Sequence, residues 1–276
     1  MFIDARNNKM AHLPPDLSSE TDVYLTKDDP LIAYKNYVTR ANVSASSAEL
    51  FNPAVNLANP STYLKWKAAA AVPCFIKTML PDMPVDYVGI ARHNLGTAGV
   101  SISITAEKGG TTIQLLQDTL LTSDEPVLVR VERGTYESVS VALSGGSIPQ
   151  TIAVLYVGEL LTVPHGIPTG YTPLKHGVKT EVVSGKSQSG EFLGRRIISE
   201  GTSTSIPFQQ LNGAWYRMHL APAIKLMRTL PFFFAWSPRH YPEETGFCWT
   251  VNDPRPTIDD QEGRINVTLE VAGLTK

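Results

Sequence analysis

Aromatic side chains are the residues of this sequence best suited to chemistry, and the chemistry they suit is binding. A flat aromatic face with a polar edge fits a sugar ring, which carries C–H groups on its faces and hydroxyls around its rim. Tyr63, Trp66 and His93 are therefore candidate glycan-binding residues. The competing interpretation is that they belong to a core, as most aromatics at strand spacing do.

A second aromatic group suggests an interface. Phe232, Phe233 and Phe234 are consecutive and are followed closely by Trp236. Neighbouring side chains of a strand face opposite sides, so one face cannot bury all three phenylalanines. We expect one of them to contact another domain or subunit, unless the strand is buried on both faces. These four residues form the candidate interface.

Catalytic motifs are missing from the chain. It contains no G-x-S-x-G, H-E-x-x-H, G-x-x-x-x-G-K-[ST] or G-x-G-x-x-G sequence. Adjacent carboxylates such as Glu243 and Glu244 rarely face one substrate. The acidic cluster of Asp259, Asp260 and Glu262 supplies fewer oxygens than calcium requires, which favours a solvated loop. We expect no catalytic residue, no metal and no cofactor, and therefore no enzyme; a site assembled from distant loops is the alternative.

Charge and hydropathy exclude other classes of partner. The 276 residues include 24 basic and 26 acidic side chains, a net charge of -2, so no basic field attracts nucleic acid. No apolar run reaches the ~18 residues of a membrane helix, so no membrane insertion is expected. The first residues lack the apolar stretch of a signal peptide. Two distant cysteines, Cys74 and Cys248, predict buried free thiols, with one long-range disulfide left open.

The elements that position these residues are mainly strands. Apolar and polar residues alternate with period two over residues 101–105, 127–132 and 139–143, and residues 152–157 form a β-rich run that two buried faces would explain. Glycine and proline pairs separate these segments. The pattern predicts a β-sandwich over residues 31–163, in which residues 63–72 fit either a weak helix or a strand edge.

The second half of the chain is less regular. Three further strands are expected, over residues 232–236, 247–251 and 265–271. A short helix over residues 219–230 would place Leu220, Ile224 and Met227 on one face. Residues 1–30 are polar and interrupted by prolines, as in an extended arm. The predicted fold is therefore all-β, with an N-terminal arm, two β-sandwich or jelly-roll-like domains (31–163 and 164–276) and at most short helices.

The first domain resembles discoidin-like, or galactose-binding-like, jelly rolls. The resemblance lies in ASSAELFNPAVNLANPSTYLKW (45–66), VDYVGIARHNL (85–95) and the closing strand TIAVLYVG (151–158). In that family, ligands meet the loops at one end of the sandwich. The resemblance transfers no individual sugar-binding residue to this sequence.

The second domain resembles a domain of tail proteins of tailed bacteriophages. The matching stretches are FLGR (192–195), PFFFAWSP (231–238), YPEE (241–244) and the strand at 263–273. This resemblance implies a virion structural protein of the tail tip or baseplate, made in the host cytoplasm, that assembles into a ring-like homo-oligomer and with other tail proteins. The alternative is a carbohydrate-binding module that adsorbs the particle to a host-surface glycan. Exposure of Tyr63, Trp66 or His93 beside polar side chains distinguishes the two.

Overall fold

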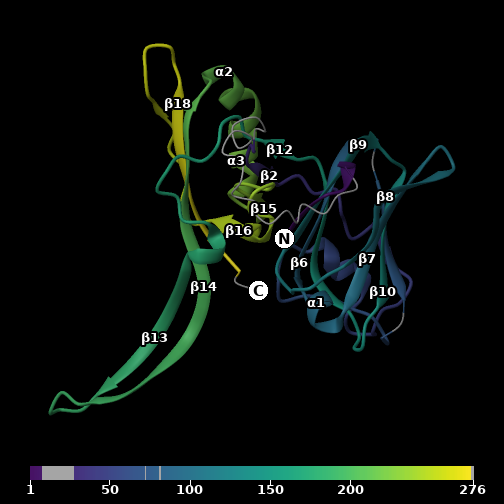
Figure 1. Ribbon diagram of the computed structural model, residues 1–276, viewed down its shortest axis with the longest axis horizontal. Coiled ribbons are helices and arrows are strands. Elements are labelled where there is room, and N and C mark those ends of the chain that lie inside the picture. The colour runs from purple at the N-terminus through teal and green to yellow at the C-terminus, as the bar shows by residue number, and fades with distance from the viewer. Residues whose placement is uncertain (8–27, 72, 81, 275–276) are drawn as a thin grey trace, which may run out of the picture.

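The computed structural model describes residues 1–7, 28–71, 73–80 and 82–274. Its described residues form three β-sheets and several short helices, which confirms the all-β class (Figure 1). No helix among these residues is long and apolar enough to cross a membrane.

Two five-stranded sheets form the first domain. One has the order β1-β9-β6-β11-β4 and the other the order β3-β5-β10-β7-β8. The strands are β1 (Phe2–Asp4), β3 (Val43–Ala45), β4 (Trp66–Lys67), β5 (Cys74–Met79), β6 (Pro84–His93), β7 (Val100–Lys108), β8 (Thr111–Leu120), β9 (Val127–Thr135), β10 (Ser138–Gly145) and β11 (Thr151–Gly158). Short helices η1 (Ala5–Asn7), η2 (Ala54–Ala58) and α1 (Leu95–Ala98) lie between them.

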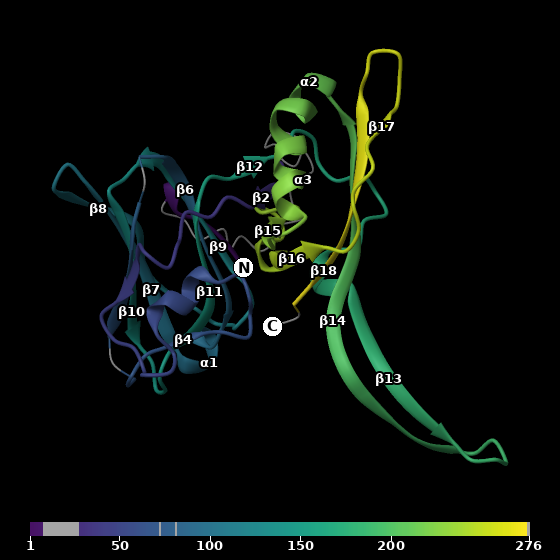
Figure 2. The ribbon, with the colours of Figure 1, turned by 180° about the vertical axis from the view of Figure 1, so that it is seen from behind.

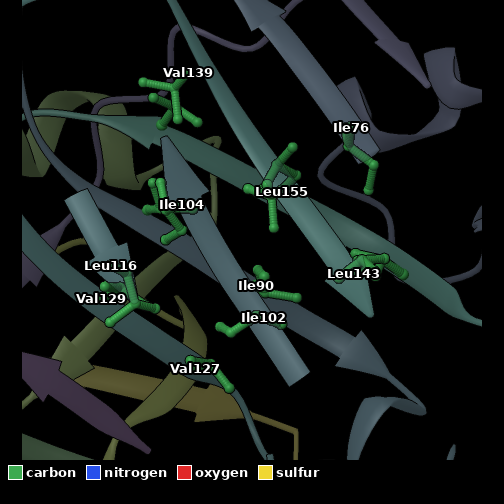
Figure 3. Packing of buried hydrophobic residues seen from close by; sticks show 14 of the residues in the cluster. Ile76, Ile90, Ile102, Ile104, Leu116, Val127, Val129, Val139, Leu143 and Leu155 are labelled. Atoms are coloured by element: carbon green, nitrogen blue, oxygen red, sulfur yellow. The ribbon is translucent and has the colours of Figure 1, made fainter. Parts of the chain in front are cut away.

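The core of the sandwich follows from the period-two pattern. In β7, side chains alternate between buried and half-buried, with Ile102 and Ile104 facing inward. Facing strands contribute Ile90, Val129 and Leu155 from the other sheet (Figure 3). Alternation places one face of each strand in a common apolar layer, as the sequence predicts.

The second domain is built on one long sheet. Its order is β12-β2-β15-β16-β18-β14-β13, and β17 pairs with β18. The strands are β2 (Leu31–Ala33), β12 (Leu161–Thr162), β13 (Val178–Lys186), β14 (Phe192–Leu211), β15 (Phe232–Ala235), β16 (Gly246–Thr250), β17 (Thr257–Ile258) and β18 (Ile265–Gly273). The remaining turns are η3 (Leu174–His176) and η5 (Pro242–Glu244).

A helical segment, rather than a second sheet, covers one face of this sheet. It consists of α2 (Gly213–Trp215), the π-helical turn η4 (Tyr216–Leu220) and α3 (Ala221–Met227). Leu220, Ile224 and Met227 are buried against the sheet, as their helical spacing predicts. The other helix-compatible stretch is residues 63–72, whose described part, residues 63–71, contains a loop and β4 instead.

The ends of the domains differ in part from the expected boundaries. Sheet membership changes between β11 and β12, close to the expected boundary at residue 163. However, β1 pairs in parallel with β9, so the first residues belong to the sandwich rather than to an arm. β2 lies between β12 and β15 of the second sheet, so its apolar LIA segment belongs to that sheet and not to the expected first domain. Residues 8–27, most of the expected arm, lie outside the described residues.

The two domains share an apolar interface. Strands β6 and β11 are buried on both faces, because their outer face packs on β15 and β16. Phe232 and Phe234 point into the core of the second domain, whereas Phe233 points toward the first. A Cβ at Gly89 would lie 2.6 Å from the Phe233 ring, so glycine permits this close approach. Both cysteines are buried free thiols, in different cores.

Beyond this interface, one element projects from the body. β13 and the first part of β14 form a long hairpin that extends away from both domains in two opposite views (Figures 1 and 2).

Candidate functional site

The loop before β4 brings Tyr63 to the surface of the first domain. The Tyr63 side chain is 89% exposed. Hydrogen bonds hold the loop in shape: Asn56 Nδ2 donates to the Lys65 carbonyl at 2.9 Å, and Ser61 N donates to Asn59 Oδ1 at 2.9 Å. The exposed ring is therefore presented on a locally ordered backbone.

Trp66 anchors this loop from below. Its side chain is completely buried, and its indole Nε1 donates to the Ser47 carbonyl at 2.8 Å. The expected glycan-binding role of Trp66 is therefore wrong, because strand alternation directs its ring into the sandwich core.

His93 ends β6 and is also largely buried. Its Nδ1 accepts a hydrogen bond from Leu95 N at 3.2 Å, and its Nε2 lies 2.9 Å from the Glu125 carbonyl. A ring that accepts at Nδ1 and donates at Nε2 is neutral. Burial lowers the pKa of His93 to about 4, which agrees with this neutral form. Since both ring nitrogens are in use, His93 positions two loops and does not offer a free group to a ligand.

These loops surround an open concavity of about 930 Å³. Its residues come from both domains: Phe51, Asn52, Asn56, Thr62, Tyr63, Leu64, Lys65, Arg92, His93, Asp124, Thr151, Ala153, Glu200 and Leu274. Phe51, which no motif of the sequence indicates, is 84% exposed. Two exposed aromatic rings thus lie among polar side chains of both charges.

Some charged groups of the concavity already hydrogen-bond to other residues of the chain. Asp124 accepts hydrogen bonds from Thr97 N at 2.9 Å and from Thr97 Oγ1 at 2.5 Å. Burial alone would raise the pKa of the Asp124 carboxyl, but these hydrogen bonds outweigh it and lower the pKa. Arg92 adopts a φ of 53°, a left-handed conformation that is energetically costly for arginine. No neighbouring residue in the sequence predicts this conformation.

The aromatic triplet does not form a surface for another subunit. Phe232, Phe233 and Phe234 are each at most 1% exposed. The contact expected with another domain or subunit is made inside this chain: Phe233 packs on the first domain, while Phe232 and Phe234 face the second core, so the strand is buried on both faces. Trp236 is half-buried, stacks on Tyr241 with ring centroids 5.2 Å apart and donates to Glu244 Oε2 at 2.6 Å.

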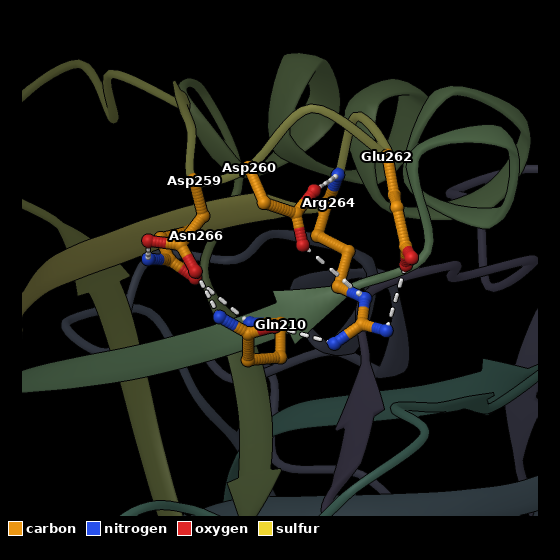
Figure 4. A network of polar contacts seen from close by, with 6 residues as sticks. All are labelled: Gln210, Asp259, Asp260, Glu262, Arg264 and Asn266. Carbon is orange, nitrogen blue, oxygen red and sulfur yellow. Dashed lines mark hydrogen bonds and ion pairs between the residues drawn. The ribbon is translucent and has the colours of Figure 1, made fainter.

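The two acidic clusters of the sequence also serve structural roles. Glu244 is buried and accepts a hydrogen bond from the Trp236 indole. Glu243 and Glu244 therefore do not face one substrate as a pair. The second cluster is held by hydrogen bonds and ion pairs (Figure 4). These link Gln210, Asp259, Asp260, Glu262, Arg264 and Asn266. Among the described residues, no group of three or more His, Cys, Asp or Glu is arranged to hold a metal.

Comparison with known proteins gives likenesses to solved structures only. No family model matches the chain, and no curated protein matches it. The chitosan-binding module 1 of a chitosanase/glucanase from Paenibacillus sp. IK-5 is 19% identical, with a TM-score of 0.39, over 45% of this chain and 99% of the module. The family 32 carbohydrate-binding module of C. perfringens NanJ, solved with galactose, is 16% identical, with a TM-score of 0.39, over 48% of this chain and 99% of the module.

A third likeness is to the CBM32 of AlyQ, solved with 4,5-unsaturated mannuronic acid. It is 17% identical, with a TM-score of 0.37, over 45% of this chain and 96% of that module. All three are carbohydrate-binding modules by their descriptions, and each resembles less than half of this chain.

Proposed function

We propose that this protein is a non-enzymatic binding protein that holds a carbohydrate in the concavity around Tyr63. The observation that carries the proposal is the 89% exposed Tyr63 ring, which lines the same concavity as Phe51 and stands on a loop fixed by its own hydrogen bonds. Aromatic rings that line a concavity together with polar groups are typical of a binding site. Because the loop is already ordered, a ligand would lose little affinity to ordering it.

The polar lining supports a sugar rather than an apolar ligand. Asn52 and Lys65 border the same concavity as the two rings, and positive and negative side chains occur together there. A sugar requires such a surface, with aromatic faces for its C–H groups and polar groups for its hydroxyls. The mixed charge favours a neutral or weakly charged glycan.

Binding to a glycan array, followed by titration calorimetry of the best ligand, tests this proposal. Tyr63→Ala should weaken binding at least about tenfold, since aromatic anchors dominate such sites. Phe192→Ala is the matched control, because Phe192 is also exposed but lies on the hairpin. No glycan binding at millimolar concentrations, or unchanged affinity in Tyr63→Ala, would contradict the proposal.

A second candidate function is that of a structural protein in the tail tip or baseplate of a phage virion. The projecting hairpin favours it, because exposed apolar residues on a thin element suit assembly with neighbours. In that role the protein is made in the host cytoplasm and contacts other tail proteins and copies of itself. The two functions are compatible, since a tail protein with this concavity would adsorb the particle to a host-surface glycan.

A further inference from the structure

The projecting hairpin, residues 178–202, is exposed over almost its whole length. None of its residues from Val178 to Glu200 is buried. Phe192 and Leu193 near its tip are 67% and 68% exposed. A two-stranded hairpin is marginally stable alone, whereas three or more strands form a stable sheet. The hairpin therefore gains from pairing with further strands.

The outer edge of β13 is open to such pairing. β13 is the last strand of its sheet, and within the described part of the chain no strand pairs with its outer edge. An open edge presents backbone N–H and C=O groups in the geometry that another strand needs. β13 continues regularly across Glu181 and Val182, because the extra residue of the nearby bulge belongs to β14.

We propose that the outer edge of β13 pairs antiparallel with β13 of a second copy of this chain, about a two-fold axis at Thr180. In this register Lys179 lies opposite Glu181 of the second copy, and Glu181 lies opposite its Lys179. Val178 and Val182 likewise face each other across the axis, and the two Thr180 side chains meet. Opposite charges, β-branched pairs and Thr–Thr pairs all stabilise cross-strand contacts.

Other two-fold registers within β13 lack this complementarity. In an antiparallel pair, the side chains of directly opposite residues point to the same face of the sheet. The two-fold axis must therefore lie midway between the two copies of one residue. An axis at Lys179 or Glu181 places two like charges opposite each other. An axis at Val182 or Val183 places Lys179 and Glu181 opposite uncharged residues. Among these positions, only Thr180 matches both charges.

The product is a four-stranded sheet with the order β14-β13-β13-β14. Val182 pairs with Ile197 across the hairpin, so both lie on one face. Pairing the edges gathers Val178, Val182 and Ile197 of both copies on that face. The contact uses the same residues from each copy and therefore closes as a dimer. A ring of subunits would need a second, different contact.

Charge reversal tests the register without touching a buried residue. Lys179→Glu places two Glu–Glu pairs at the contact, and Glu181→Lys places two Lys–Lys pairs there. The double variant restores opposite charges, as does an equimolar mixture of the two single variants. Lys186→Glu is the matched control, since Lys186 lies on β13 outside the five paired residues. All forms are measured by sedimentation velocity from about 1 µM to several hundred µM, because a small interface gives a weak dimer.

The wild type and Lys186→Glu should dimerise alike with rising concentration. Each single reversal should raise the dissociation constant about tenfold or more. The double variant and the mixture should return to within about threefold of the wild type. A wild type that stays monomeric throughout, or a Lys179→Glu variant that dimerises as well as the wild type, would overturn the proposal. The outcome is read out separately from glycan binding, because no variant changes a residue of the concavity, including Glu200 of the hairpin.

Discussion

His93 shows how burial decides the role of a residue that the sequence leaves open. Its ring is held by Leu95 N and the Glu125 carbonyl, and its protonation would break the first of these hydrogen bonds. The folded state therefore requires neutral His93. This requirement links the stability of the first domain to pH.

Stability should fall in acid because of His93. Burial lowers its pKa to about 4 in the folded state, against ~6.5 in the unfolded chain. Between these values the unfolded chain binds more protons, so the free energy of unfolding rises with pH. Neutral His93 makes its full contribution to the free energy of unfolding above about pH 6.5. This contribution, ~3 kcal/mol in total, is lost as the pH falls toward 4.

Urea unfolding of the wild type and of His93→Gln at several values between pH 4 and 7 measures this slope. The variant should show a flatter dependence, whatever its absolute stability. Equal slopes in the two proteins would show that another group carries the acid sensitivity.

For the three candidate glycan-binding residues, the sequence shows the type of side chain but not its exposure. Aromatic or imidazole character is visible at Tyr63, Trp66 and His93 alike. Which of them faces solvent depends on the pairing of β4 with β11 and on distant loops that cover the His93 ring. These contacts join residues far apart in the chain, so the sequence alone cannot separate Tyr63 from the other two.

At the scale of elements, the helical segment depends on one cap. Asn212 Oδ1 accepts hydrogen bonds from Ala214 N at 2.9 Å and from Trp215 N at 3.1 Å. Asn212→Ala should lower the free energy of unfolding by ~1 kcal/mol, whereas Asn212→Ser or Asn212→Asp should retain most of it. Chemical denaturation of the three variants checks this, and an equal loss in all three would exclude capping as the cause.

Phe233 joins the two domains, and its removal should be costly. The ring is fully buried, with its centroid 4.8 Å from that of Phe247 and 5.6 Å from that of Tyr156. Phe233→Ala should lower the free energy of unfolding by ~3–5 kcal/mol, because a cavity replaces the ring. Exposed Phe192→Ala should change it by less than ~0.5 kcal/mol. Calorimetry of both variants measures the difference, and similar values would contradict the buried position of Phe233.

The elements differ in how much of them the sequence predicts. β7 and β10 alternate in the sequence as they do in the fold, because each has one face in the sandwich core. The 20-residue β14 has no such alternation, since most of its hairpin half has no buried face. The Phe232–Phe234 run predicts two faces with different partners. It does not predict that the other partner is the chain's own first domain.

For the whole molecule, the hairpin is separable from the fold that carries it. The apolar interface of the two domains contains no residue of 178–202. Thr180 and Glu200 are directly paired, so replacing residues 181–199 with Asn-Gly closes the hairpin by a two-residue turn. The shortened protein should keep its Tm within about 2 °C, because it loses no buried side chain.

The same shortened protein should also separate the two proposed activities. It retains every residue of the concavity, including Glu200 next to the new turn, so glycan affinity should match that of the wild type. It lacks Glu181 and Val182, so it should remain monomeric at concentrations where the wild type dimerises. Loss of both activities together would mean that glycan binding needs two copies of the chain. A shortened protein that still dimerises would show that the contact between copies lies on another surface.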